Sequence, residues 1–169
     1  GLRFLVHQAA NYRIDTGYIF LAGQSEGGMT AMNVAYMNQP EANLLLPGAF
    51  ADLGPIDSAG NNFFEPFSLK GIFNWCGAIA DTGIIQNDTP IPLLSIHGLL
   101  DSVMPVELGT YLNCQNANNP YPVMYGPKSI YQRMKNQGIC SEANYDANGE
   151  HCFFPSLEPN IYIPAKFTC

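Results

Sequence analysis

The sequence has few charged residues, and basic residues are the scarcer kind. Only 12% of its 169 residues are charged, with 7 Lys and Arg against 14 Asp and Glu, and the formal net charge is −7. Nucleic acids and anionic membranes attract clustered positive charge. Neither is therefore expected as a partner. The sequence also lacks an apolar run long enough to cross a bilayer, a signal peptide, an internal repeat and a low-complexity segment.

No group of cysteines and histidines has the spacing of a zinc site, so neither a metal nor another cofactor is expected. The five cysteines are many for a cytosolic chain: Cys76, Cys114, Cys140, Cys152 and Cys169. We expect at least one disulfide, and hence a secreted or periplasmic protein. The odd number leaves one cysteine free or paired outside the chain. Cys76, in the apolar run at 72–76, is the expected free one, and the pairing of the other four stays open.

Apolar residues make up 47% of the chain, enough for a hydrophobic core, and the length fits a single domain over residues 1–169. Strand patterns and helical patterns alternate. We expect helices at 2–12, 29–37 and 125–137, and strands at 18–22, 71–76, 90–98 and 141–148. Residues 42–50 are expected to be strand-like or irregular, 52–65 and 113–127 to be loops, and the tail at 160–169 to be extended. This order predicts an α/β fold with a parallel sheet.

The most informative motif is Gly-Gln-Ser-Glu-Gly at residues 23–27. It lies between an expected strand and an expected helix, where a G-x-S-x-G turn lifts a serine hydroxyl off the end of the sheet. Glycines flank the serine because the turn brings backbone segments too close together for a Cβ. Ser25 is therefore the candidate nucleophile. The backbone N–H of Glu26 is a candidate oxyanion-hole donor, and its carboxylate fits either a substrate groove or a plain first-turn acid.

Two more candidate residues follow later strands. In parallel sheets the site lies beyond the carboxyl ends of the strands. Asp101 follows the strand expected at 90–98, and His151 follows the strand expected at 141–148. The order Ser, Asp, His is that of hydrolases with this type of sheet. His151 would take the proton from Ser25 and later give it to the leaving alcohol, while Asp101 would fix the tautomer of the imidazole.

Other residues compete for these roles. Asp81 and Asp146 are alternatives for the acid, and His97 is an alternative for the base. His97 precedes Asp101 by four residues and could instead brace the turn after its strand. His7, on the first expected helix, is expected to be a surface or packing histidine.

Taken together, these residues make the sequence resemble the secreted α/β-hydrolase esterases, most nearly the polyhydroxybutyrate depolymerase, feruloyl esterase and acetylxylan esterase type. Three motifs in register carry the resemblance: Gly-Gln-Ser-Glu-Gly-Gly at 23–28, His-Gly-Leu-Leu-Asp at 97–101 and Gly-Glu-His at 149–151. The resemblance implies an α/β-hydrolase-type parallel sheet flanked by helices. It also implies a catalytic triad of Ser25, Asp101 and His151.

The sequence departs from this family in one respect. Members have several strands before the nucleophile strand, and a His-Gly-type loop that supplies the second oxyanion donor. The resemblance therefore implies the carboxyl-terminal half of the domain without the amino-terminal strands. A second polypeptide, a longer chain or a partner would then complete the sheet, since an exposed sheet edge is unfavourable in water.

The expected function is serine carboxylic-ester hydrolysis through an acyl-enzyme, acting on carbohydrate esters or on other small-molecule or polymeric esters. Two alternatives stay open. The chain could be a non-catalytic, hydrolase-like module that binds carbohydrate through its aromatic residues. It could also be a serine peptidase of the same fold, because the motif does not separate ester from amide cleavage. The acyl and alcohol groups cannot be read from the sequence.

Overall fold

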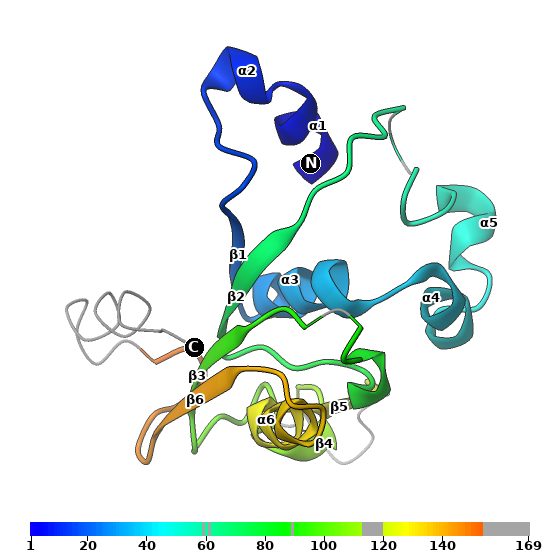
Figure 1. Cartoon of the computed structure of the whole chain (residues 1–169). Coiled ribbons are helices and arrows are strands. Elements are labelled where there is room, and N and C mark those ends of the chain that lie inside the picture. The colour runs from blue at the N-terminus through cyan, green and yellow to red at the C-terminus, as the bar shows by residue number, and fades with distance from the viewer. Residues whose placement is uncertain (59, 61, 89, 113–119, 154–169) are drawn as a thin grey trace.

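The computed structural model describes residues 1–58, 60, 62–88, 90–112 and 120–153. Its central element is a four-stranded parallel sheet with the strand order β1–β2–β3–β6 (Figure 1). The strands are β1 (Ile19–Gln24), β2 (Leu69–Trp75), β3 (Leu93–Gly98) and β6 (Ser141–Asp146). Each of the four strands expected from the sequence is present, with shifted ends, and the predicted α/β fold class is confirmed.

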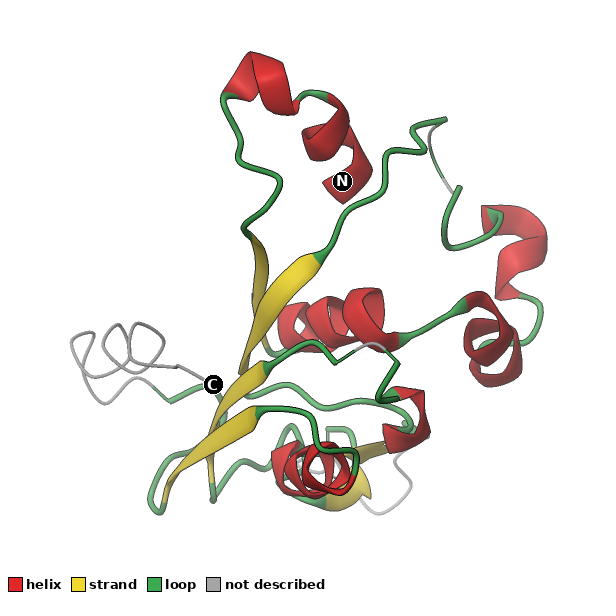
Figure 2. Ribbon diagram, viewed as in Figure 1, coloured by secondary structure: helices red, strands yellow, loops and turns green. Residues whose placement is uncertain are grey.

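Two longer helices cover one face of this sheet (Figure 2). They are α3 (Glu26–Tyr36), which packs against β1 and β2, and α6 (Pro127–Asn136), which packs against β3 and β6. The remaining elements are α1 (Leu2–His7), α2 (Ala9–Tyr12), α4 (Gln39–Leu45), α5 (Ala49–Leu53), the 3₁₀ turn η1 (Thr82–Ile84) and an antiparallel pair formed by β4 (Leu108–Thr110) and β5 (Val123–Tyr125). Among the described helices none is both long and apolar enough to span a membrane.

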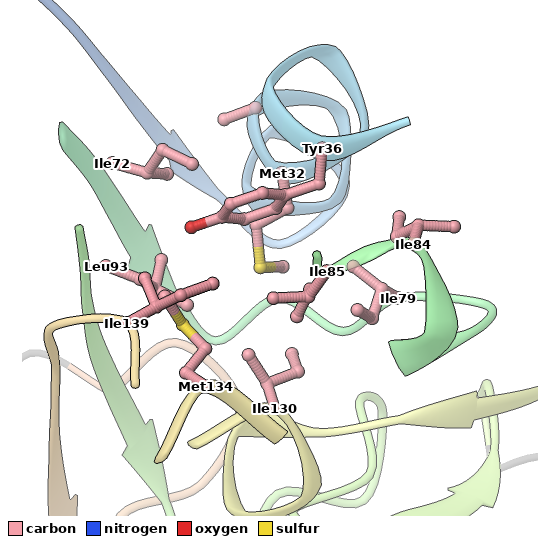
Figure 3. Packing of buried hydrophobic residues seen from close by; sticks show 11 residues of the cluster. Met32, Tyr36, Ile72, Ile79, Ile84, Ile85, Leu93, Ile130, Met134 and Ile139 are labelled. Carbon is pink, nitrogen blue, oxygen red and sulfur yellow. The ribbon is translucent and has the colours of Figure 1, made fainter. Parts of the chain in front are cut away.

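The strand register decides which side chains reach the core. Leu21 pairs with Ile72, and Ile72 pairs with Leu93, so these three side chains lie on the face that the helices cover. Met32 of α3 and Met134 of α6 meet them from the helix side (Figure 3). Every residue of β3 is buried, as expected for an interior strand of a parallel sheet. This burial explains the apolar run in its sequence.

The structure corrects two secondary-structure expectations. Residues 42–50, expected to be strand-like or irregular, belong mostly to α4 and α5. The reason is a capping box, in which the Asn38 side chain accepts from the Glu41 amide and the Glu41 carboxylate accepts from the Asn38 amide. Pro40 lies in the first turn of α4, where proline is well tolerated. The helix expected at 2–12 is divided at Gln8 into α1 and α2.

The extended tail expected at 160–169 lies outside the described residues, and so do residues 113–119 of the loop expected at 113–127. The described remainder of that loop contains β5.

The prediction that Cys76 is the free cysteine is wrong. Cys76 forms a disulfide with Cys152, with the two Cα atoms 5.3 Å apart, and Cys140 is disulfide-bonded as well. The apolar run around Cys76 correctly indicated a core position, since Cys76 is fully buried. It could not reveal that the loop after β6 comes back to the end of β2, because that contact joins residues 76 positions apart.

We expect the Cys76–Cys152 disulfide to stabilise the fold by restricting the unfolded chain. For a closed loop of this length the chain-entropy estimate is about 4 kcal/mol. The double substitution Cys76→Ala with Cys152→Ala should lower the free energy of unfolding by roughly that amount. The measurement is urea denaturation without reductant, which keeps the bond of Cys140 intact. A loss below about 1 kcal/mol would contradict the expectation.

Candidate active site

Ser25 lies on the sharp turn that joins β1 to α3. Its φ of 55° and ψ of −123° form a backbone conformation that non-glycine residues rarely adopt, and such strain concentrates at functional sites. The turn is so tight that a Cβ on Gly23 would collide with the carbonyl of Gly27. The amide of Ser25 donates to the carbonyl of Trp75 over 2.8 Å, which anchors the turn to the end of β2. The hydroxyl is thereby held at the carboxyl edge of the sheet.

His151 brings its imidazole to this hydroxyl from the loop after β6. Its Nε2 lies 3.0 Å from the Oγ of Ser25, and its Nδ1 lies 2.9 Å from Oδ2 of Asp101. The side chain is one-quarter exposed, so a water molecule or substrate can reach it. The three residues that the sequence singled out are therefore adjacent, in the order hydroxyl, imidazole, carboxylate.

Three contacts hold the loop that carries His151. The amide of Leu100 donates to the carbonyl of Gly149 over 2.9 Å. A Cβ on Gly98 would collide with that same carbonyl, so glycine is required for the loop to approach the end of β3. The Cys76–Cys152 disulfide then ties the residue after His151 to the end of β2. The imidazole is thus attached to the two central strands.

The side chain of Asp101 is completely buried and accepts hydrogen bonds on both carboxylate oxygens. The amides of Val103 and Met104 donate to Oδ1 over 2.8 and 2.9 Å. His97 and His151 contact Oδ2 at 3.0 and 2.9 Å. Burial raises the pKa of this carboxyl, but these four donors outweigh burial and hold the pKa below its ordinary value. Asp101 is accordingly an anion at neutral pH.

The competing candidates are occupied elsewhere. Asp81 caps the 3₁₀ turn by accepting from the amide of Gly83, and Asp146 accepts from the amide of Asn148. His97 contacts Asp101 and the carbonyl of Met104, and not Ser25. His7 lies on the surface, where it pairs with Glu65, as expected for a histidine outside the site.

The Glu26 side chain lies beside the site and is paired with Tyr111, a contact that the sequence did not reveal. The Tyr111 hydroxyl donates to the Glu26 carboxylate. This hydrogen bond is the main cause that lowers the pKa of Glu26, and it raises the pKa of Tyr111 to about 12. The positive charge of a protonated His151 lowers the pKa of Glu26 further. The two residues are 85 positions apart, so no local pattern could have predicted the pair.

One group of potential metal ligands occurs within the described part of the chain: Cys76, His151 and Cys152. The two sulfur atoms are joined to each other, and the free nitrogen of His151 faces Ser25. The group is therefore a disulfide beside an imidazole, and in this state it offers no set of ligands for a metal.

Neither a protein-family model nor a curated protein matches the sequence. Solved structures with a similar fold include the following three. A truncated carbohydrate esterase from gut microbiota has a TM-score of 0.61 and 19% identity over 88% of this chain. An acetyl ester-xyloside bifunctional hydrolase from Caldicellulosiruptor lactoaceticus has a TM-score of 0.59 and 17% identity over 96%. The esterase PE8 has a TM-score of 0.57 and 18% identity over 98%.

The chain spans 57% of the length of each of these three proteins. At such low identity the similarity establishes the fold alone. The fold of this chain is one that esterases share.

Proposed function

We propose that the chain carries the catalytic residues of a serine carboxylic-ester hydrolase. The observation that carries the proposal is the unbroken series of contacts from the Ser25 hydroxyl through His151 to the buried Asp101 carboxylate. The strained turn at Ser25 supports it, since a nucleophile raised at the carboxyl edge of a parallel sheet is accessible to a substrate. The esterase fold of the similar solved structures supports it as well.

The mechanism follows from these contacts. The oxygen of Ser25 attacks the ester carbonyl carbon while Nε2 of His151 takes the hydroxyl proton. The π electrons of the carbonyl bond move to the carbonyl oxygen, which becomes the oxyanion. The tetrahedral intermediate collapses, the bond to the alcohol oxygen breaks, and His151 returns the proton to that oxygen. Water then attacks the acyl-enzyme with the same proton transfers and releases the acid and free Ser25. Asp101 stabilises the imidazolium in both halves of the reaction.

The oxyanion would form beside the first residue of α3. The first hydrogen bond into this helix runs from the Met29 amide to the Ser25 carbonyl, so the amide of Glu26 precedes the helical ladder. An N–H group at a helix start, with the positive end of the helix dipole behind it, favours developing negative charge. We assign the Glu26 amide as one oxyanion donor.

We propose neutral carbohydrate or polymeric esters as the substrates, in an oxidising compartment. Two of the similar solved structures are described as a carbohydrate esterase and an acetyl ester-xyloside hydrolase. The Glu26 carboxylate, ionised at neutral pH, would repel an acyl or alcohol group that carries its own negative charge. The disulfides support a secreted or periplasmic location.

We also propose that a further polypeptide extends the sheet beyond β1. Within the described residues β1 pairs only with β2, which leaves its other edge open. Phe20 of β1 is 63% exposed, on the face opposite α3. Parallel sheets normally have both faces covered and avoid long open edges. An added strand would pair with the open edge of β1, and its connection would cover Phe20.

Native mass spectrometry of the active protein from its source tests this extension. We expect a folded species heavier than 18.5 kDa that contains polypeptide sequence other than residues 1–169. A fully active monomer of 18.5 kDa would contradict the proposal, and so would a dimer made of this chain alone.

Replacing the proposed nucleophile tests the function itself. Ser25→Ala should lower kcat for p-nitrophenyl acetate by at least about 10⁴-fold, because it removes the attacking oxygen and leaves binding intact. The matched control is Ser58→Ala, which removes an exposed hydroxyl from the loop after α5 and should leave kcat unchanged. Equal turnover by the two variants would refute serine catalysis. Faster cleavage of peptide amides than of esters by the wild type would assign a peptidase instead.

Neutralising Glu26 should change the pH dependence of the reaction. The lowered pKa of Glu26 keeps its carboxylate ionised at assay pH, where it stabilises the imidazolium form of His151. In Glu26→Gln the imidazolium loses this support. The acid limb of the kcat/KM profile should therefore move to lower pH by a fraction of a unit.

Asp52→Asn, which removes an exposed charge from α5, is the control for this change and should not move the limb. An acid limb that stays in place in Glu26→Gln, or moves upward, would show that the carboxylate does not act on His151.

A further inference from the structure

His97 is a buried imidazole that the proposed chemistry does not use. It lies near the end of β3, and none of its side chain is exposed. The register places it on the same face of the sheet as Leu93 and Ser95, below the turn that carries Asp101. Burying a polar ring is costly unless hydrogen bonds compensate for it. The hydrogen-bond partners of the His97 imidazole must therefore explain why it is buried.

The partners of His97 define where its proton lies. Nε2 is 3.0 Å from Oδ2 of Asp101 and 3.3 Å from the carbonyl oxygen of Met104. Both are acceptors, so Nε2 must carry a hydrogen. Nδ1 is buried and has no hydrogen-bond partner among the described residues. A proton on Nδ1 would be left without an acceptor, so the neutral ring is the Nε2–H tautomer.

In this tautomer the N–H of His97 is shared between the carbonyl of Met104 and Oδ2 of Asp101, the same carboxylate oxygen that His151 contacts. Oδ2 of Asp101 accepts the N–H of His151 and faces the shared N–H of His97, while Oδ1 accepts from two backbone amides. All the strong acceptor positions of the carboxylate are then filled, and its plane is fixed. The N–H of His97 also draws negative charge away from Oδ2, and so limits how strongly Asp101 stabilises a protonated His151.

We propose that His97 is a positioning residue for the reaction, which holds the Asp101 carboxylate in the orientation that His151 requires and moderates its charge. This inference rests on the proposed function. Among the described residues, Glu26 on α3 is the other charged group that interacts with His151, and Glu26 is unchanged in the variants below.

The test compares a variant without the donor with one that restores it. His97→Phe keeps a buried ring but has no N–H, whereas the side-chain amide of His97→Gln can place an N–H near the position of Nε2. In His97→Phe we expect kcat for p-nitrophenyl acetate to fall about 10- to 100-fold, as for a lost hydrogen bond to a charged group, with KM within twofold. His97→Gln should recover most of this loss.

The pH profile separates positioning from a merely structural effect. Without the His97 donor more negative charge remains on Oδ2, the protonated form of His151 is favoured, and the acid limb of kcat/KM should move to higher pH. His97→Gln should return it toward the wild-type position. His7→Phe, which removes an exposed imidazole from α1, should change neither kcat nor the limb. An unmoved limb in His97→Phe, or equal defects in the Phe and Gln variants, would overturn the proposal.

A readout that does not depend on catalysis keeps the outcomes distinct. The ¹⁵N chemical shifts of His97 in the wild-type protein at pH 8 should show a protonated Nε2 and an unprotonated Nδ1. The opposite tautomer would overturn the positioning role even in an active enzyme. Conversely, the expected tautomer in a wild-type protein without esterase activity would refute the proposed function and leave the donor geometry standing. If His97→Phe does not fold, His97→Leu replaces it as the variant without a donor.

Discussion

The buried carboxylate of Asp101 is the constraint on which the site depends. An ion that is fully removed from water is tolerated only when donors replace its hydration. Here two backbone amides, contributed by the turn itself, and two imidazoles perform this task. The turn after β3 must therefore keep its conformation, and the loop after β6 must bring His151 close enough to donate. The geometry around Ser25 follows from these two requirements.

The parallel sheet makes this arrangement possible, because it brings the carboxyl ends of β1, β3 and β6 to one edge. The segments that follow these strands then need only short connections to meet. Close backbone approaches at Gly23 and Gly98 remove the remaining separation, since a side chain at either position would push two segments apart. The Cys76–Cys152 disulfide adds a covalent link between the end of β2, the remaining strand of the sheet, and the loop that carries His151.

The carboxylates around the candidate base act in different ways, and burial explains the difference. Asp101 is inaccessible to solvent and is fixed by four donors, so its effect on His151 is strong and directional. Glu26 is exposed, is held by Tyr111, and acts on His151 through a solvent-screened field. One carboxylate would orient the imidazole, and the other would adjust the charge that a substrate meets.

The sequence by itself determined the parts of this protein that depend on neighbouring residues. A near-continuous apolar run marked β3, because a strand buried on both faces needs apolar residues at almost every position. The Gly-Gln-Ser-Glu-Gly turn marked Ser25, since few residue types tolerate that backbone conformation. A local pattern also existed for α4, in the spacing of Asn38 and Glu41, although residues 42–50 were expected to be strand-like or irregular.

Only the tertiary structure decided which distant side chains touch. The contact of Asp101 with His151, the contacts of His97, the partner of Cys76 and the contact of Tyr111 with Glu26 all depend on segments that meet across the sheet edge. Such contacts leave no mark on the local sequence, because the free energy that forms them comes from burial and hydrogen bonding between segments far apart in the chain.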